Sequence, residues 1–368
     1  MKIVLTGGGT AGHCLPNLAL VARLNATFTQ IDYVGSKTGM ERELALAAGL
    51  SYHGVETCKL VRSLTPKNLL VPFQLLRGRA ECIRLLKKLA PDVVFSKGGY
   101  VALPVALACK RLKIPLVCHE SDLSFGLSNR LCLPFATRVL TAFPQTANGV
   151  KNAKFIGTPL RENLFRAKRS EGLCRYGFDG QKPVLLILGG SLGAESLNRA
   201  VLQLLDDLLK KFDVLHLVGK KNTLPLPQKK GYVWRNFEPE MEFAYAAASF
   251  ALSRAGANAL FELTALGIPT LAVPLSSGRG DQKENAAYFA EHGAVAVLGE
   301  EQLHTKSLYD ELLSLRKNAP AMRRAMQKLG IKNTNAAIVE ELTAVAKAHY
   351  KTPLPQENSP SLKRKSPQ

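Results

Sequence analysis

The chain has 368 residues, more than one hydrophobic core comfortably organises, and 46% of them are hydrophobic, which excludes a disordered chain and predicts two globular domains. The formal net charge of +20 predicts an anionic partner, namely a phosphorylated substrate, an anionic lipid surface or nucleic acid, and does not choose among these. Seven cysteines without a C-x-x-C pair favour reduced thiols, and the lack of an apolar run of membrane-spanning length predicts a cytoplasmic protein rather than an integral membrane one.

The first predicted strand, 2–6, runs into a glycine-rich loop with the sequence GGGTAGHCLP at 7–16, and a helix is predicted over 15–24. The loop matches the G-x-G-x-x-G spacing of a dinucleotide site. Such a site also needs an acidic residue at the end of the second strand, but the predicted strand 31–34 is followed by glycine, serine and lysine. The pattern therefore argues against a nicotinamide cofactor.

His13 lies where this loop enters the helix. The positive end of a helix lowers the pKa of an imidazole and favours a neutral ring that can accept a proton. In the alternative interpretation, His13 is only hydrogen-bonded within a tight turn. The residues alone leave both interpretations open.

Strands and helices continue to alternate, with helices predicted over 40–48, 73–89 and 101–112 and strands over 52–56, 92–96 and 116–118. Two of these strands precede unusual loops. The first loop contains Gly98, Gly99 and Tyr100, and the second, HESDLSFGLSNR at 119–130, contains the hydrogen-bonding side chains of His119, Glu120, Asp122 and Asn129. Ligands of doubly wound sheets bind at the carboxyl ends of strands, so we expect three loops to converge on one site.

A basic stretch interleaved with apolar residues covers 59–88. Its cations are Lys59, Arg62, Lys67, Arg77, Arg79, Arg84, Lys87 and Lys88, against the single acid Glu81. For 59–71 we predict contact with an anionic membrane surface, because apolar side chains among cations suit such a surface. For 73–89 we predict a core helix that buries Phe73, Leu76, Ala80 and Ile83 and leaves a solvated basic face.

Strands at 138–141 and 154–157 are expected to close the first sheet, after which charged residues over 161–175 indicate a boundary. A new apolar strand at 184–188 then leads into a second glycine loop, GGSLGAES at 189–196. This loop lacks the lysine and the spacing of a Walker motif, but Ser191 and the neighbouring backbone N–H groups can hold a phosphate. The chain thus starts the same architecture again.

The remaining strands are predicted at 214–218, 232–237, 250–252, 270–273 and 295–298, with helices at 240–247 and from 257 onward to about 350. The helix that opens at Ala257 offers unpaired N–H groups and a partial positive charge, which suit a diphosphate. Glu262 lies about one turn further in, where a carboxylate can accept hydrogen bonds from a ribose diol. The alternative is an ordinary βαβ unit with a solvated Glu262. Asp281, Gln282 and Asn285 follow in a polar segment that suits a sugar.

Two halves that each begin with a strand, a glycine loop and a helix predict an α/β fold of two Rossmann-like, doubly wound domains facing across a cleft. This arrangement resembles the GT-B architecture of glycosyltransferases. We expect the domains at 1–160 and 161–331, with a last helix at about 332–350 packing back on the first. Residues 351–368 are rich in Pro, Ser and Lys, and we expect a disordered basic tail.

The motifs also resemble those of the MurG family. They are GGGTAGH-x-x-P at 7–16, GGY at 98–100, HES-x-x-x-x-G-x-x-N at 119–129, G-x-P-x-R at 157–161, GGS-x-GA at 189–194, and SRAGA-x-x-x-x-E with DQ-x-x-NA over 253–286. The resemblance implies inverting transfer of N-acetylglucosamine from UDP-N-acetylglucosamine to the 4-hydroxyl of the muramoyl sugar of lipid I, undecaprenyl-diphospho-muramoylpentapeptide. It also implies lipid II synthesis for peptidoglycan by a peripheral protein on the cytoplasmic side of the cell membrane.

The resemblance assigns site residues as well. Donor contacts fall on Thr10, Ala11, Gly12, Arg161, Ser191, Ala257, Asn258, Ala259, Leu260, Phe261, Glu262 and Gln282, and the uracil would meet backbone near Phe237 and Glu238. Acceptor contacts fall on Gly98, Gly99, Tyr100, His119, Glu120 and Asn129. His13 becomes the candidate general base, or else a ligand of the acceptor diphosphate. Asp122 stands where the family has an amide, cannot donate a hydrogen bond when ionised, and is a second candidate for the base.

No D-x-D, H-E-x-x-H or clustered Cys/His motif occurs, so we expect neither a metal nor another cofactor. The leaving UDP would be stabilised by the Ala257 helix terminus, the Ser191 loop and Arg254. Two rival functions are a UDP-sugar epimerase, which gives no reason for the basic apolar stretch, and a nucleic-acid-binding module. The second explains the charge but not Glu262, Gln282 and the glycine loops, so we expect no nucleic-acid partner.

Overall fold

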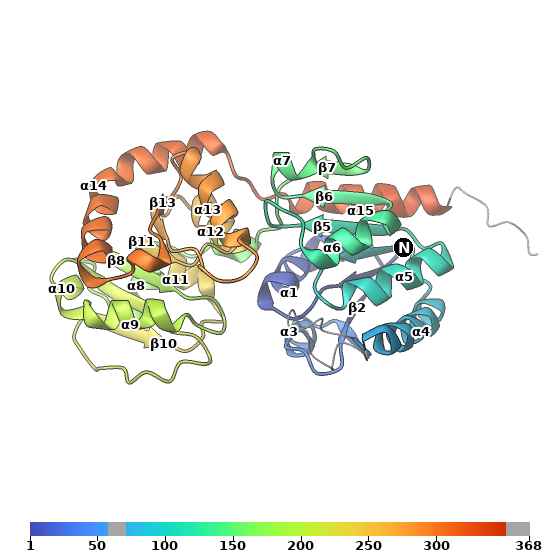
Figure 1. Cartoon of the computed structure of the whole chain (residues 1–368), viewed down its shortest axis with the longest axis horizontal. Helices are drawn as coiled ribbons and strands as arrows, with labels where there is room; N and C mark the ends of the chain where they lie inside the picture. The colour runs from blue at the N-terminus through green and yellow to red at the C-terminus, as the bar shows by residue number, and fades with distance from the viewer. Residues whose placement is uncertain (58–70, 351–368) are drawn as a thin grey trace, which may run out of the picture.

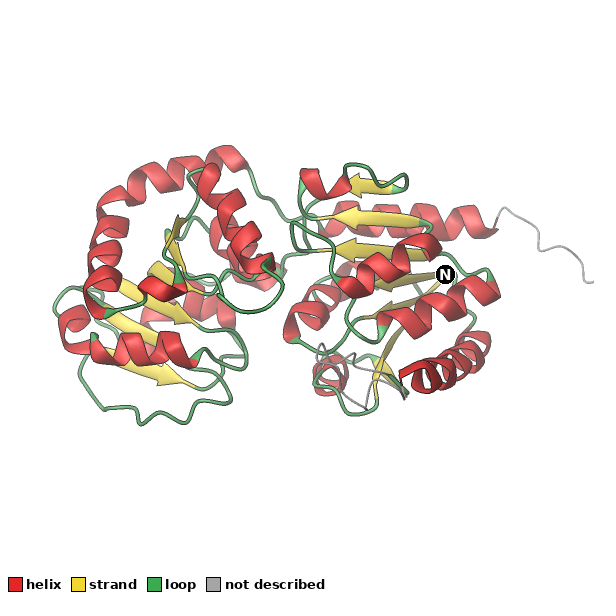
Figure 2. Cartoon of the chain, in the orientation of Figure 1, coloured by secondary structure: helices red, strands yellow, loops and turns green. Residues whose placement is uncertain are grey.

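Two parallel β-sheets, each covered by helices, form two lobes that lie side by side (Figure 1). The computed structural model describes residues 1–57 and 71–350. Within these residues one sheet has seven strands and the other has six, and every strand pair is parallel. Figure 2 shows helices on both faces of each sheet. The predicted pair of doubly wound, Rossmann-like lobes is therefore confirmed.

The first sheet has the strand order β3-β2-β1-β4-β5-β6-β7. Its strands are β1 (Lys2–Thr6), β2 (Gln30–Ser36), β3 (Ser51–Val55), β4 (Val93–Ser96), β5 (Leu116–Glu120), β6 (Arg138–Thr141) and β7 (Ala153–Phe155). Its helices are α1 (Ala11–Leu18), α2 (Val21–Leu24), α3 (Glu41–Ala47), α4 (Val71–Leu89), α5 (Ala102–Leu112), α6 (Leu127–Cys132), η2 (Leu133–Phe135) and α7 (Pro144–Ala147). The order reverses between β1 and β4, and ligands of such sheets bind outside the carboxyl ends of the strands at that point.

The second sheet has the strand order β10-β9-β8-β11-β12-β13. Its strands are β8 (Val184–Leu188), β9 (Asp213–Leu217), β10 (Tyr232–Arg235), β11 (Ala248–Ser253), β12 (Thr270–Ala272) and β13 (Ala296–Val297). Its helices are η3 (Glu162–Phe165), α8 (Arg169–Tyr176), α9 (Glu195–Gln203), α10 (Leu205–Leu209), α11 (Met241–Ala247), α12 (Ala257–Ala265), α13 (Asp281–Glu291), η4 (Glu300–Gln302) and α14 (Thr305–Leu329). The order reverses between β8 and β11, so the second glycine loop and the start of α12 flank this reversal.

The last helix, α15 (Asn335–Tyr350), returns to the first lobe (Figure 1). Its residues Ile338, Leu342 and Ala346 recur every fourth position, are fully buried, and join the core cluster that contains Ile3 and Leu5 of β1. Repetition at this spacing places the side chains on one helix face. The chain therefore crosses between the lobes twice, once after β7 and once before α15.

The two crossings are hydrogen-bonded to each other. Asn335 accepts a bond from the Leu160 N–H at 3.2 Å and donates to the Leu160 carbonyl at 2.8 Å, and Thr334 donates to the Thr158 carbonyl at 2.9 Å. Gly157 opens the first crossing with φ +91°, and a Cβ there would lie 2.8 Å from a Thr334 methyl carbon. Only glycine tolerates both the backbone angle and the close approach.

Helix α4 buries a different face from the one that its apolar residues predict. Phe73 and Leu76 are 72% and 58% exposed, and the face that packs inward consists of Gly78, Cys82, Leu86 and Leu89. A Cβ at Gly78 would lie 2.3 Å from the Glu56 carbonyl oxygen, so the bare glycine lets the helix approach the end of β3 closely. That approach turns Phe73 and Leu76 outward, and the predicted core face was wrong.

Helix α1 begins at Ala11, four residues before the predicted start, and the chain turns again into α2. His13 therefore lies inside the first turn of a helix rather than ahead of it. The predicted membrane segment lies outside the described residues except for Val71, and the predicted tail at 351–368 lies outside them entirely. Within the described ranges, none of the helices combines the length and the apolar character that a bilayer span requires.

Candidate active site

The first glycine loop packs directly against the loop that follows β4. A Cβ at Gly99 would lie 2.1 Å from the Gly8 carbonyl oxygen, and one at Gly9 would lie 2.5 Å from the Tyr100 ring. Gly98 and Gly99 both have positive φ, at +88° and +82°. The residues at 98–100 thus pack against the loop at 7–10. A side chain at Gly9 or Gly99 would push the two loops apart.

A buried carboxylate supports this loop from below. Glu41 accepts hydrogen bonds from the Ser36 backbone at 3.0 Å and the Ser36 hydroxyl at 2.6 Å, and its other oxygen accepts from the Gly9 N–H at 3.3 Å. It is fully buried, so all of these bonds form away from water. Glu41 therefore ties the end of β2 to the glycine loop, a role that the sequence analysis did not assign.

His13 is half-buried at the start of α1, and its Nδ1 lies 2.9 Å from the Thr10 hydroxyl oxygen. Burial lowers the pKa of His13, and the nearby Lys97 lowers it further, while the Asp122 and Glu41 carboxylates act to raise it. The imidazole is therefore neutral at neutral pH. When Nδ1 donates its proton to Thr10, the lone pair of Nε2 is left to accept one.

The loop after β5 is organised by Glu120. One carboxylate oxygen accepts from the backbone N–H groups of Ser121 and Asp122 at 2.9 and 3.0 Å, and the other accepts from Gly126 and the Asn129 side chain, each at 2.9 Å. Glu120, Asn129 and His119 are all buried. The structure thus places these three predicted acceptor contacts in the framework beneath the site, where they shape the loop.

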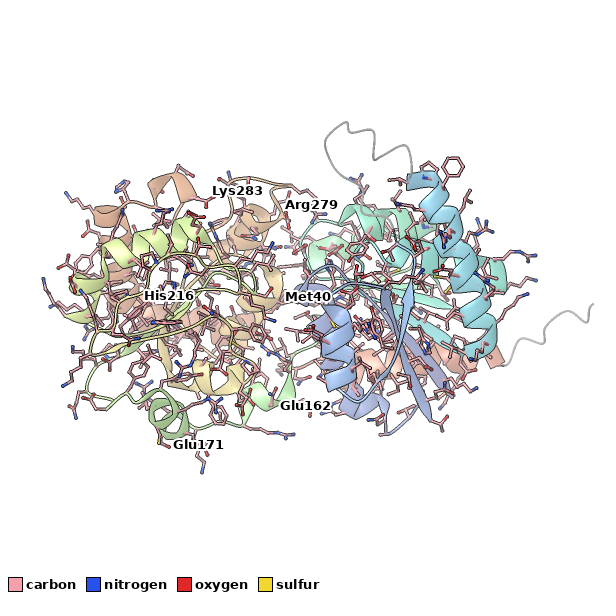
Figure 3. The ribbon with its side chains drawn as sticks, turned by 90° about the horizontal axis from the view of Figure 1, so that it is seen from below. Met40, Glu162, Glu171, His216, Arg279 and Lys283 are labelled. Carbon is pink, nitrogen blue, oxygen red and sulfur yellow. The ribbon has the colours of Figure 1, made fainter. Side chains whose placement is uncertain are left out.

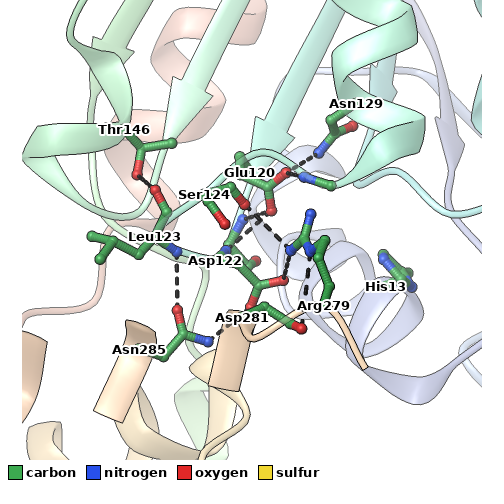
Figure 4. A network of polar contacts seen from close by, with 12 residues as sticks. His13, Glu120, Asp122, Leu123, Ser124, Asn129, Thr146, Arg279, Asp281 and Asn285 are labelled. Carbon is green, nitrogen blue, oxygen red and sulfur yellow. Dashed lines mark hydrogen bonds and ion pairs between the residues drawn. The ribbon is translucent and has the colours of Figure 1, made fainter. Parts of the chain in front are cut away.

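Asp122 reaches across to the second lobe (Figure 4). Its carboxylate accepts a hydrogen bond from the Asn285 amide at 3.0 Å and lies 3.4 Å from Arg279, while the Leu123 N–H donates to the Asn285 carbonyl oxygen at 2.9 Å. Figure 3 shows Arg279 at the edge of the second lobe that faces the first. The two lobes therefore meet through polar side chains at this end of the cleft.

Burial and the nearby Glu120 carboxylate raise the pKa of Asp122 to about 6, even though Asn285 and Arg279 act to lower it. A folded-state pKa above the unfolded value of 3.8 means that ionisation of Asp122 opposes folding, so its contribution to stability falls as pH rises from about 4 to about 6.

We expect Asp122→Asn to abolish this pH-dependent loss of stability. Its melting temperature relative to wild type should be higher at about pH 8 than at about pH 4; an equal difference at both would contradict the shift.

The start of α12 faces the first glycine loop. Its N-cap, Gly256, makes no side-chain cap hydrogen bond, and a Cβ there would meet no atom within 4 Å, so the space beside the N-cap is open. The Asn258 amide donates to the Gly12 carbonyl oxygen at 2.9 Å across the lobes. Ala257, Leu260 and Phe261 are buried, so of these predicted donor contacts only the backbone can face a ligand. Ala259 is half-buried in the same helix.

Glu262 is paired rather than solvated, and its predicted contact with a ribose diol stays a prediction. Arg161 donates to both of its oxygens, from Nε and Nη2, each at 3.1 Å, and the Tyr245 hydroxyl donates to one of them at 2.9 Å. Both partners of the ion pair are largely buried. Arg161 therefore joins the interlobe crossing to α12.

The remaining predicted donor residues lie in three other segments of the second lobe. The Ser191 carbonyl accepts from the Lys220 N–H at 3.2 Å, and the Lys220 ammonium stands 4.6 Å from the centre of the partly exposed Phe237 ring. The Gln282 side chain accepts from the Leu275 N–H at 3.0 Å, which fixes the loop before α13.

Arg254 is held by groups of its own lobe, and its predicted role in stabilising UDP stays a prediction. It is 8% exposed, pairs with Glu300, and donates to the Ser196 hydroxyl at 2.8 Å and the Val273 carbonyl at 3.2 Å. Burial acts to raise the pKa of Glu300, but hydrogen bonds from Ser276, Arg254 and Ser196 lower it to about 2. Arg254 thus connects α9, through Ser196, and η4, through Glu300, to the end of the sheet at Val273.

Sequence reasoning missed Lys97, Arg279 and Tyr245. Lys97 is the first residue after β4, so the rule that ligand sites follow strand ends could have found it. The other two carried no signal, because their partners lie on the other lobe or in a distant helix. Among the described residues, no group of three or more His, Cys, Asp or Glu side chains is placed to hold a metal ion.

Comparison with known proteins decides the family. Residues 3–141 match the glycosyltransferase family 28 N-terminal domain, and residues 184–342 match the glycosyltransferase family 28 C-terminal domain. The chain belongs to glycosyltransferase family 28. The prediction that the protein is a glycosyltransferase is therefore confirmed, and the two matched regions correspond to the two lobes.

Individual members of the family extend this result. A UDP-N-acetylglucosamine--N-acetylmuramyl-(pentapeptide) pyrophosphoryl-undecaprenol N-acetylglucosamine transferase of Lachnoclostridium phytofermentans is 46% identical, covering 92% of this chain and 96% of its own. A relative of the same name from Oceanobacillus iheyensis is 41% identical, covering 94% and 99%. The crystal structure of Acinetobacter baumannii MurG is 25% identical and superposes with a TM-score of 0.72 over 93% of this chain and 99% of that one. These likenesses confirm the predicted MurG resemblance and the GT-B fold of this family 28 transferase.

A Neisseria meningitidis UDP-GlcNAc 2-epimerase bound to UDP-GlcNAc shares the fold, with a TM-score of 0.67 and 15% identity over 94% of this chain and 100% of that one. This likeness shows the fold alone. The architecture is thus common to the predicted transferase and to its rival.

Proposed function

We propose that the protein transfers N-acetylglucosamine from UDP-N-acetylglucosamine to the 4-hydroxyl of the muramoyl sugar of lipid I, with inversion, to form lipid II for peptidoglycan. The observation that carries the proposal is the uncapped start of α12 facing the first glycine loop, joined by the 2.9 Å bond from Asn258 to Gly12. One side offers N–H dipoles for a diphosphate and the other offers a neutral imidazole. A nucleotide-sugar transferase needs both halves in one cleft.

The donor would occupy the second lobe. Its diphosphate would receive hydrogen bonds from the N–H groups at the start of α12 and from the Ser191 loop, and Gln282 would bind hydroxyls of the sugar. Glu262 would accept from the ribose diol, and the uracil would meet the backbone near Phe237. These assignments rest on the family resemblance and on the uncapped start of α12.

The transfer would be a single displacement. The acceptor oxygen forms a bond to the anomeric carbon, and the bond from that carbon to the β-phosphate oxygen of UDP breaks. The β-phosphate oxygen keeps the electron pair of the broken bond. The hydroxyl proton passes to His13 Nε2, or to Asp122 in the alternative. Main-chain N–H groups at α12 stabilise the charge that develops on the leaving diphosphate.

A second proposal concerns the membrane, because the acceptor is a lipid. Phe73 and Leu76 project from α4 among the exposed cations Arg77 and Lys87. An apolar pair with a basic surround suits an anionic leaflet. We therefore place peripheral contact on this helix and on the basic segment before it, at the cytoplasmic face where a nucleotide-sugar donor is found.

Replacing both Phe73 and Leu76 by Ser should weaken binding to anionic vesicles roughly tenfold or more, because two exposed apolar side chains no longer enter the interface. Vesicle sedimentation measures the effect. Phe155→Ser is the matched control, since Phe155 is also exposed, at 51%, but lies on β7. Replacing Arg62 and Lys67 by Glu, outside the described residues, should weaken binding most at low salt. Unchanged vesicle binding in both double variants would rule out the proposed membrane contact.

The transfer itself is tested by incubating the purified protein with labelled UDP-N-acetylglucosamine and a short-chain lipid I analogue. We expect UDP release that depends on the acceptor, together with a labelled lipid product. Conversion of the donor to its 2-epimer without an acceptor would instead identify an epimerase. Thermal stabilisation by UDP, with no effect of DNA or RNA, sets aside the nucleic-acid alternative.

A further inference from the structure

Lys97 is a buried lysine at the carboxyl end of β4. It follows β4, its backbone N–H donates to the Thr6 carbonyl at 2.9 Å, and the residue is only 2% exposed. Its ammonium nitrogen lies 2.6 Å from His119 Nδ1 and 2.6 Å from the Ser121 hydroxyl oxygen. The position follows from strand register: β4 pairs with β5 with Ser96 opposite Cys118, so the residues that come next, Lys97 and His119, are neighbours.

A lysine without a carboxylate partner is an expensive group to bury. Lys97 takes part in none of the ion pairs found among the described residues. Burial lowers the pKa of Lys97 to about 7, although the carboxylates of Glu120 and Asp122 act to raise it. An apolar side chain would fill the same space at lower cost, so the ammonium itself needs an explanation.

The direction of the two hydrogen bonds is fixed by chemistry. His119 Nε2 lies 2.8 Å from the Gly157 carbonyl oxygen, which can only accept, so Nε2 carries the proton. Burial and Lys97 lower the pKa of His119 well below its usual value, so the ring is neutral and Nδ1 has a lone pair. Lys97 is therefore the donor to His119, and His119 connects it to Gly157 at the start of the interlobe crossing.

The second bond of Lys97 holds the loop that carries Asp122. The Ser121 hydroxyl accepts from the ammonium, while the N–H groups of Ser121 and Asp122 both donate to Glu120. The turn is thus held from two sides, and Asp122 projects toward Asn285 of the second lobe. Without the ammonium, the Ser121 side of the turn would lose its anchor.

Lys97 also lies near His13, because a Cβ at Gly7 would lie 2.8 Å from the His13 carbonyl oxygen and 3.3 Å from Lys97 Cβ. The charged groups around His13 come from three elements: Lys97 after β4, Asp122 after β5, and Glu41 at the start of α3. Lys97 is the one cation among them and opposes the two carboxylates, which favour a protonated ring. Its charge therefore helps to keep the imidazole in the form that can accept a proton.

We propose that Lys97 is a positioning residue of the transfer reaction, which anchors the 120–122 turn through Ser121 and supplies a positive charge near His13. This inference rests on the proposed function, because it assumes that His13 or Asp122 takes the proton of the acceptor. Lys97 touches neither substrate and acts through these two residues.

The test compares Lys97→Met, which removes the charge, with Lys97→Arg, which keeps it, in the full-length protein. We expect Lys97→Met to lower kcat by about tenfold to a hundredfold, as small misplacements of reacting groups do, with little change in donor KM. The acidic limb of kcat/KM against pH should move to higher pH in this variant and stay in place in Lys97→Arg. Lys317→Met, at an exposed position of α14, is the control for loss of one charge. It should change neither kcat nor the position of the acidic limb.

A second readout does not depend on turnover. The titration of the His13 imidazole, followed by NMR without substrates, should give a higher pKa in Lys97→Met than in wild type. Ser121→Ala removes only the hydrogen bond between Lys97 and Ser121, so it should lower kcat and leave the titration of His13 unchanged. If Lys97→Met does not fold, this variant still tests whether that bond matters for turnover. Wild-type kcat in Lys97→Met or in Ser121→Ala, or an unmoved His13 titration in a folded Lys97→Met, would overturn the proposal. If the wild-type protein shows no acceptor-dependent release of UDP, the proposed function is wrong, while the effect of Lys97 on the His13 titration remains valid.

Discussion

Glu262→Ala is expected to raise the KM for UDP-N-acetylglucosamine by roughly 10²-fold, with a much smaller fall in kcat. Hydrogen bonds to a charged group contribute about 1.5–3 kcal/mol each, and a ribose diol offers two of them. The ribose lies far from the reacting bond, so these contacts are equally strong before and during the reaction, and their loss appears in KM. Steady-state kinetics at saturating acceptor measures both constants.

Tyr245→Phe is the matched control, because it removes one hydrogen bond to Glu262 and leaves the carboxylate and its Arg161 pair in place. The donor KM of this variant should stay within a few-fold of wild type, since the lost hydrogen bond joins two protein groups and the carboxylate oxygens remain available to the ribose. A wild-type donor KM in Glu262→Ala would remove Glu262 from the donor site. Unfolding of that variant alone would show that its pair with Arg161 is chiefly structural.

The pairing of Glu262 also has a consequence for donor binding. A carboxylate has about four lone-pair sites. Arg161 occupies two of them and Tyr245 a third, so a ribose diol that needs two sites must displace one partner. Because Arg161 belongs to the interlobe crossing, its release would link occupation of the ribose site to movement of the lobes.

Much of the fold could be predicted from the sequence, because parallel strands buried on both faces appear as short apolar runs ended by glycine or polar turns. The strands at 2–6, 138–141 and 184–188 have the predicted ends to the residue. The start of α12 at Ala257 also agrees, since small residues after a strand mark a turn that opens a helix. Local chemistry fixes these elements.

Features that depend on distant partners could not be predicted. On α4, one apolar series contains Phe73 and Leu76 and another contains Cys82 and Leu86, and periodicity alone does not rank them. The close approach of Gly78 to the Glu56 carbonyl selects the second series. The pair of Arg161 with Glu262 joins residues 101 positions apart, and no local pattern announces it.

His13→Ala is expected to lower kcat by about 10²–10⁴-fold, the usual contribution of general-base catalysis, while the KM for the donor stays near its wild-type value. In the proposed arrangement the donor diphosphate would lie at the start of α12 and His13 belongs to the other lobe, so removing the imidazole should leave the donor contacts intact. Burial and Lys97 lower the pKa of His13, so wild-type activity should fall as pH drops through that lowered value, where the ring becomes protonated. The variant should lose this limb of the pH profile.

Thr10→Val provides the control that separates the proton acceptor from its orientation. It keeps the imidazole but removes the hydroxyl 2.9 Å from Nδ1, so kcat should fall by much less than in His13→Ala, and the acidic limb should remain. If His13→Ala retains wild-type turnover, the imidazole takes no part in proton removal and Asp122 becomes the candidate base. Asp122→Asn would then have to show the large loss of kcat, because an amide has the same shape as the carboxylate but cannot take the proton.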